Sequence, residues 1–243
     1  MKKSAVIWLC IAGALVIAGV AGIVTAVVLQ GGLGQIIKNE TEIKTYSISD
    51  GINNISIDVS TQDITFVKSE NGESRVVSEY KKGYELEIKE ENGTLKIEYP
   101  GNQKWHEKIS LFSFGKNRIT VYLGKSQYSD IDIECSTGDV NINSVNCDDL
   151  EIKLSTGDIT LKNVVATAEF DIKSSTGDVR FDGCDAGDIS VKTSTGDVTG
   201  TLLTDKIFSA KTSTGDINVP KSKTGGKCEI NTSTGDIFIE IKK

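Results

Sequence analysis

Residues 133–142 read Ile-Glu-Cys-Ser-Thr-Gly-Asp-Val-Asn-Ile, and the Ser-Thr-Gly-Asp at their centre decides the fold. The same four residues return five more times, with starts 19 or 20 residues apart, and Val or Ile follows every copy. A fixed period near 20 residues predicts one structural unit stacked on itself. The copies occupy residues 136–139, 155–158, 175–178, 194–197, 213–216 and 233–236.

Alternating apolar residues flank each copy on both sides. Ile131 and Ile133 precede the first copy, and Val140 and Ile142 follow it. A period of two predicts short strands with one buried face, so each repeat supplies two strands. The predicted fold class is all-β: a single-stranded parallel β-helix, or β-solenoid, with rungs of about 19–20 residues. Its neighbouring rungs would lie about 4.7–4.9 Å apart.

The Thr-Gly-Asp part of each copy is predicted to form a corner. Every second residue before the motif is predicted to point inward, up to Thr137, and the next inward residue is Val140, three positions later. Because three is an odd number, a straight strand would place Val140 on the opposite face, so the chain must bend between these two residues. Glycine tolerates positive φ at such a bend, and the Asp carboxylate can accept hydrogen bonds from the amides of its own corner. The predicted structural corner residues are Gly138, Asp139, Gly157, Asp158, Gly177, Asp178, Gly196, Asp197, Gly215, Asp216, Gly235 and Asp236.

Stacking places the six aspartates in one column, so a calcium ladder is an alternative to a purely structural corner. Ca²⁺ takes 6–8 oxygen ligands, whereas each rung offers one carboxylate. Lysines would also compete with Ca²⁺ for the aspartate carboxylates, since an outward column next to the motif contains Lys153, Lys173, Lys192 and Lys211. We therefore predict no metal site, no cofactor and no catalytic residue.

The four cysteines after the amino-terminal segment occupy inward columns. Cys228, for example, takes the position that Leu150 and Phe170 hold in earlier repeats. Buried free cysteine behaves as a small hydrophobe, so we expect free thiols at Cys135, Cys147, Cys184 and Cys228.

The amino terminus has the composition of a membrane span. Residues 5–29 contain no charged side chain. This uncharged stretch is long enough to cross a bilayer and is longer than the apolar part of a signal peptide. Lys2 and Lys3 favour a cytoplasmic amino end. We predict a signal-anchor transmembrane helix in residues 1–30, with a cleaved signal peptide as the alternative, and a flexible linker in residues 31–40. The protein would be a single-pass cell-membrane protein with an extracytoplasmic carboxyl-terminal domain.

Residues 41–130 alternate as strands do, and Ser60-Thr61-Gln62-Asp63 resembles a degenerate copy of the motif. We predict a β-rich lead-in that is continuous with the repeat solenoid of residues 131–243. Residues 237–243 would be its last strand and an exposed edge.

One insertion in the lead-in is rich in aromatic residues. Its side chains would either contact a partner or the membrane surface, or fold back over the core. We favour the second arrangement, in which they cover the core. A lone histidine without a nucleophile or carboxylate beside it is a poor catalyst. The candidate contact residues are Trp105, His106, Phe112 and Phe114.

Two segments carry a family resemblance. Residues 119–125, Ile-Thr-Val-Tyr-Leu-Gly-Lys, and Ile131-Asp-Ile-Glu before the serial Ser-Thr-Gly-Asp motifs resemble the toastrack family of bacterial putative-adhesin β-strand repeats, which includes LiaG-like membrane-anchored proteins. The likeness covers roughly residues 46–243, and Gly124 stands where family members commonly have Pro. The resemblance implies a bacterial surface location and a solenoid-like fold, and it supplies no catalytic residues.

Three functions fit these observations. The favoured one is a non-enzymatic binding module, adhesin-like or accessory to envelope stress, with an envelope protein or a cell-wall glycan as partner. The alternatives are a β-helix enzyme acting on cell-wall polysaccharide and a purely structural spacer. The formal net charge of −7 disfavours a nucleic-acid partner, which calls for a basic surface.

Overall fold

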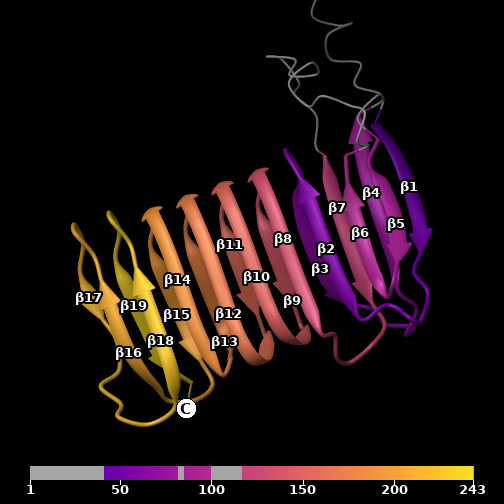
Figure 1. Cartoon of the computed structure of the whole chain (residues 1–243). Coiled ribbons are helices and arrows are strands. Elements are labelled where there is room, and N and C mark those ends of the chain that lie inside the picture. The colour runs from indigo at the N-terminus through magenta and orange to yellow at the C-terminus, as the bar shows by residue number, and fades with distance from the viewer. Residues whose placement is uncertain (1–40, 82–84, 100–116, 243) are drawn as a thin grey trace, which may run out of the picture. The chain divides into compact units, whose positions relative to one another are not determined.

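The computed structural model describes residues 41–81, 85–99 and 117–242, and these residues form strands and turns (Figure 1). The predicted signal-anchor, the linker and the aromatic insertion fall outside them. None of the described segments is a helix with the length and hydropathy that a membrane span needs.

The described strands form two sheets that pack face to face. Sheet A has ten strands in the spatial order β1 (Thr41–Ser47), β4 (Arg75–Lys81), β7 (Arg118–Leu123), β3 (Asp63–Lys68), β9 (Val140–Asn143), β11 (Ile159–Lys162), β13 (Val179–Cys184), β15 (Val198–Leu202), β19 (Ile237–Ile241) and β17 (Ile217–Asn218). Sheet B has nine strands in the order β16 (Lys206–Lys211), β18 (Gly226–Asn231), β14 (Asp188–Thr195), β12 (Val165–Thr176), β10 (Asn146–Thr156), β8 (Asp130–Thr137), β2 (Asn54–Val59), β6 (Thr94–Glu98) and β5 (Glu87–Glu91).

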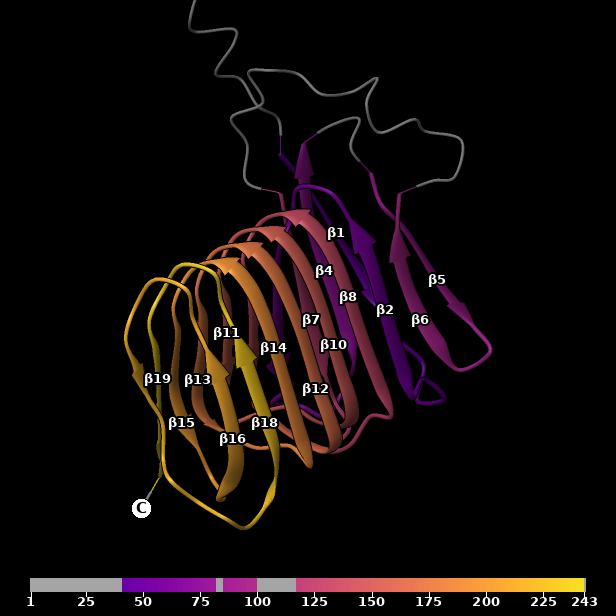
Figure 2. The same cartoon turned by 60° about the vertical axis from the view of Figure 1, so that its left-hand side comes forward.

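Each repeat places one strand in sheet B and the next in sheet A, with the Ser-Thr-Gly-Asp corner between them (Figure 2). The parallel register stacks equivalent residues, so that Ile133, Ile152 and Ile172 are in line and fully buried. Burying one such side chain contributes about 1.5–3 kcal/mol, and every rung adds several. The predicted all-β fold of parallel rungs is confirmed, with antiparallel strands β1, β4 and β5 added at one end.

The rungs do not stack in sequence order at either end. The pair β18/β19 lies between β14/β15 and β16/β17, and β2/β3 lies between β6/β7 and β8/β9. The prediction that residues 237–243 form the exposed edge is therefore wrong, because β19 pairs with β15 on one side and β17 on the other. Ile237 and Ile239 are at most 2% exposed in this place, whereas Ile217 in the end strand is 44% exposed. The gain in burial favours placing the longer, more apolar strand inside.

A buried ion pair spans the inserted rung. Lys206 Nζ in β16 lies 2.7 Å from Asp185 Oδ1, in the turn before β14, and Lys206 is only 4% exposed. The strand between them, β18, places Gly226 in register with Lys206. A Cβ on Gly226 would overlap the carbonyl oxygen of Gly187, in the turn before β14, so glycine is required here by the close approach of the two chain segments.

Candidate functional site: the repeated corner

The motif glycines adopt a backbone conformation that other residues rarely adopt. Their φ angles lie between +134° and +145° in all six copies. The rungs also approach closely here, since a Cβ on Gly177 would lie 1.9 Å from the carbonyl oxygen of Gly157. Glycine is therefore required both by φ and by the spacing between stacked corners.

The motif aspartates form a continuous hydrogen-bonded ladder along the stack. The amide of Asp158 donates to Oδ1 of Asp139 at 3.0 Å, and the amide of Asp178 donates to Oδ1 of Asp158 at 2.9 Å. The ladder starts at the degenerate copy and follows the spatial order of the rungs. Its members are Asp63, Asp139, Asp158, Asp178, Asp197, Asp236 and Asp216.

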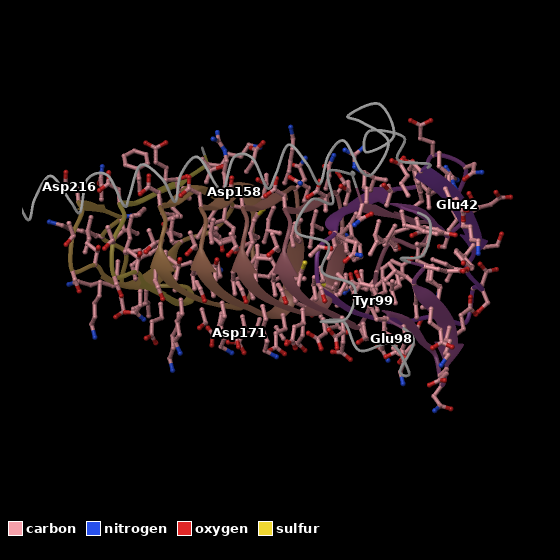
Figure 3. All side chains as sticks on the ribbon, turned by 90° about the horizontal axis from the view of Figure 1, so that it is seen from above. Glu42, Glu98, Tyr99, Asp158, Asp171 and Asp216 are labelled. Carbon is pink, nitrogen blue, oxygen red and sulfur yellow. The ribbon has the colours of Figure 1, made fainter. Side chains whose placement is uncertain are left out.

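The prediction that each carboxylate would accept amides of its own corner is wrong. The parallel ladder continues through the corner, where the amide of Val140 donates to the carbonyl of Asp158 and that of Gly157 to the carbonyl of Thr176. The amide groups at the corner therefore point along the stack, and each carboxylate meets the amide of the neighbouring rung. Figure 3 shows Asp158 and Asp216 along one side of the stack, with Asp171 and Glu98 on the other.

The serine and threonine of the motif are both exposed. Alternation ends at Cys135, so Ser136 and Thr137 both face solvent, and the predicted inward orientation of Thr137 is wrong. The bend begins one residue earlier than the sequence phase indicated. The corner side of the stack therefore presents three parallel columns, of serine, threonine and aspartate.

A shallow groove runs beside the corner on the outer face of sheet B. Its volume is about 290 Å³, and it crosses three rungs. Ion pairs order this face: Lys153 lies 2.6 Å from Glu151, and Lys173 lies 2.6 Å from Asp171. Burial, and secondly the charge of Glu151, raises the pKa of Asp132 on the same face. The groove is lined by Glu134, Cys135, Ser136, Lys153, Leu154, Ser155, Lys173, Ser174 and Ser175.

The described residues do not assemble a metal site or a nucleophile. Within them, no group of three or more His, Cys, Asp or Glu side chains is placed to hold a metal ion. The four cysteines are buried and free, and burial raises the pKa of the Cys147 and Cys228 thiols to about 12. Thiols with such pKa values are protonated at neutral pH and are poor nucleophiles.

The sequence and the structure offer two other candidate regions. The predicted contact residues Trp105, His106, Phe112 and Phe114 fall outside the described residues. A second groove of about 510 Å³, which sequence reasoning missed, lies where the Arg75 guanidinium stacks 3.9 Å from the centroid of the Tyr122 ring. Arg75 belongs to β4, an antiparallel strand outside the repeat, so no repeat signal pointed to it.

Comparison with known proteins agrees with this architecture. The family model Toastrack DUF4097 matches residues 52–243. The chain belongs to the Toastrack family. The resemblance found in the sequence is thus confirmed. No curated protein matches this Toastrack chain.

Solved structures share the Toastrack fold of this chain. It is similar to a putative cell adhesion protein from Clostridium sporogenes ATCC 15579, at 12% identity and a TM-score of 0.52, over 84% of this chain and 100% of that chain. It is also similar to a putative adhesin from Bacteroides fragilis NCTC 9343, at 16% identity and a TM-score of 0.49, over 84% of this chain and 98% of that chain. At 12% identity, the likeness to the Clostridium sporogenes structure shows the fold alone.

Proposed function

We propose that this protein is a non-enzymatic binding module, held at the outer side of the cell membrane by its amino-terminal segment, and that it binds a repetitive cell-wall glycan. The observation that supports this most directly is the corner side of the stack. Its columns repeat the same serine, threonine and aspartate on six rungs, and all of these side chains are exposed except that of Asp197, which is half-buried. A surface that repeats at one interval suits a ligand that repeats as well.

The chemistry of the columns suits sugar hydroxyls. Serine and threonine both donate and accept hydrogen bonds, and the carboxylates accept them. One such bond contributes only about 0.5–1.5 kcal/mol in water, so a single rung would bind weakly. Several rungs that engage one polymer would act together, since each contact raises the effective concentration for the next.

The uniformity of the rungs favours binding over catalysis. Acid–base catalysis on a glycan needs two carboxyl groups in different environments, one protonated and one ionised. The ladder gives its aspartates one shared environment, with each carboxylate except that of Asp216 accepting the amide of the next rung. The likeness in fold to a protein named as a putative cell adhesion protein agrees with a binding role.

The test is co-sedimentation of the full chain with purified cell-wall sacculi. We expect the wild-type chain to sediment with the sacculi. Changing Ser155 and Ser175 to Ala together with Thr156 and Thr176 to Val should weaken binding at least fivefold.

A matched control changes threonines outside the corner columns. Thr160→Val with Thr199→Val, on the outer face of sheet A, should leave binding unchanged. Absence of sedimentation, an equal loss in the control, or release of soluble glycan fragments by the chain would each contradict the proposal.

A further inference from the structure

The rung β16/β17 leaves the core of the stack unfinished. Ile217 is 44% exposed, although its column neighbours Ile237 and Val198 are fully buried. Phe208, Ala210 and Val219 are half-buried. In the previous rung, by contrast, four inner residues are at most 2% exposed: Cys228, Ile230, Ile237 and Ile239. The inner face of this rung is thus the same apolar layer that every other repeat covers with a further rung.

Both sheets stop at this rung. In the described chain, β16 is the last strand of sheet B and β17 is the last strand of sheet A (Figure 1). At the opposite end the outermost strands are β1 in sheet A and β5 in sheet B, and each pairs antiparallel with its neighbour, so that Val76 and Tyr80 in β4, behind β1, are at most 2% exposed. An unpaired strand edge is a template for another strand.

A partner that covers this end would need two strand edges at the spacing of two packed sheets. A single added strand would pair with one sheet and leave the other edge and the apolar layer open. We propose that the partner is a second copy of this chain, which joins end to end at β16 and β17 to form a dimer.

One two-fold axis satisfies both edges. An axis normal to the sheets reverses the strand direction, so β16 lies antiparallel to the β16 of the second copy and β17 lies antiparallel to its β17. The two unfinished layers then cover each other. Both sheets continue from one chain into the next.

The same rotation makes the charges complementary. It places the corner of Ser213–Asp216 from one copy over the turn of residues 219–225 from the other, because β17 separates these two turns within a chain (Figure 2). Asp216 ends the ladder, and the carboxylate of each other member accepts the amide of the next rung. The facing turn has the exposed bases Lys221 and Lys223, with Asp205 in the adjacent turn offsetting one of them.

The first experiment measures the mass of the full chain against concentration by light scattering and sedimentation velocity. We expect a dimer that dissociates on dilution and more readily at high salt. Ile217→Lys should raise the dissociation constant at least tenfold.

The control residue is Phe238, which is 42% exposed on the outer face of β19, one rung from the end. Phe238→Lys adds the same charge at a similar exposure and should leave the dimer intact. Circular dichroism of both variants shows that each is folded. A monomer at all concentrations, or a dimer that survives Ile217→Lys, overturns the proposal.

A second experiment reverses the charges. Asp216→Lys alone, and Lys221→Glu with Lys223→Glu, should each weaken the dimer, and the combined variant should restore it. Dissociation caused by Ile43→Lys instead, at the opposite end where Ile43 is 65% exposed, would show head-to-tail association and overturn the two-fold dimer.

Discussion

At the scale of single residues, the motif glycine is fixed by two separate constraints. Gly177 has φ +134°, and the carbonyl oxygen of Gly157 occupies the place of a Cβ. Gly72 separates these constraints, because its φ is +77° but nothing lies within 4 Å of a Cβ there. The two positions therefore distinguish backbone strain from steric overlap.

We expect Gly177→Ala to lower the free energy of unfolding by more than the about 1–3 kcal/mol that backbone strain alone costs. Gly72→Ala should cost only the strain, about 1–2 kcal/mol. Urea denaturation of the two variants measures the difference. Equal losses would mean that the stacked carbonyl imposes no additional constraint.

The aspartate ladder needs an acceptor atom more than it needs a charge. The amide of Asp197 donates to Asp178 Oδ1 at 2.8 Å, and asparagine retains that oxygen. Like charges about 5 Å apart in water repel by about 0.8 kcal/mol, which asparagine also relieves. Asp178→Asn should therefore leave stability equal or slightly higher.

Asp178→Ala removes the acceptor and should cost about 0.5–1.5 kcal/mol in urea denaturation. If Asp178→Asn were as destabilising as Asp178→Ala, the charge itself would be required. Loss of stability on adding a chelator to the wild-type chain would then indicate a bound cation.

At the scale of elements, the ion pair between Lys206 and Asp185 links two rungs that are not adjacent in the stack. It joins β16 to the turn before β14, with β18 in between. The alternative order, in which β16 stacks directly on β14, is the one that the sequence repeat alone favours. The buried charges are satisfied in the observed order.

Removing one partner leaves the other charge buried. We expect Asp185→Ala to lower the free energy of unfolding by about 3–5 kcal/mol, as for other buried ion pairs. Lys206→Met with Asp185→Leu should recover much of this loss, because the pair is then replaced by apolar contacts. Thermal denaturation measures both, and a loss below about 1 kcal/mol for Asp185→Ala would contradict this role.

At the scale of the whole molecule, the thiols make stability depend on alkaline pH. Burial raises the pKa of Cys147 from 9.0 to about 12, and that of Cys228 equally. In the unfolded chain these thiols lose their protons above pH 9, whereas in the folded chain they keep them until about pH 12. Rising pH therefore favours the unfolded chain over this window.

We expect the free energy of unfolding to fall from pH 9 towards pH 12 by up to about 1.4 kcal/mol per pH unit for each thiol. Cys147→Ala should reduce the dependence on pH, because it removes one titrating thiol. Alanine fits this position, since Ala166 occupies the same column in the next rung. Urea denaturation at several pH values measures the free energy of unfolding of the wild-type chain and of Cys147→Ala. The difference between the two removes the contributions of lysine and tyrosine, which titrate in both chains. An unchanged slope would show that Cys147 titrates alike in both states.

The sequence by itself determined the rung. The period of 19 or 20 residues, the alternating apolar pairs and the recurring glycine specify two strands and a corner, because each depends on local backbone geometry and on which face a residue occupies. It also placed the cysteines in buried columns and the aspartates in one exposed column. Because these patterns repeat, each copy of the motif gives the same assignment of strands and corner independently.

Only the tertiary structure decided how the rungs are ordered and what the corner presents. Inserting β18/β19 before β16/β17 depends on the burial of Ile237 and Ile239 and on an ion pair between residues 21 positions apart, Asp185 and Lys206. The ladder runs between rungs because the amides point along the stack, which no single repeat encodes. The open end follows from that order, since Ile217 and Ile237 both follow a Ser-Thr-Gly-Asp motif and only Ile237 lies between two rungs.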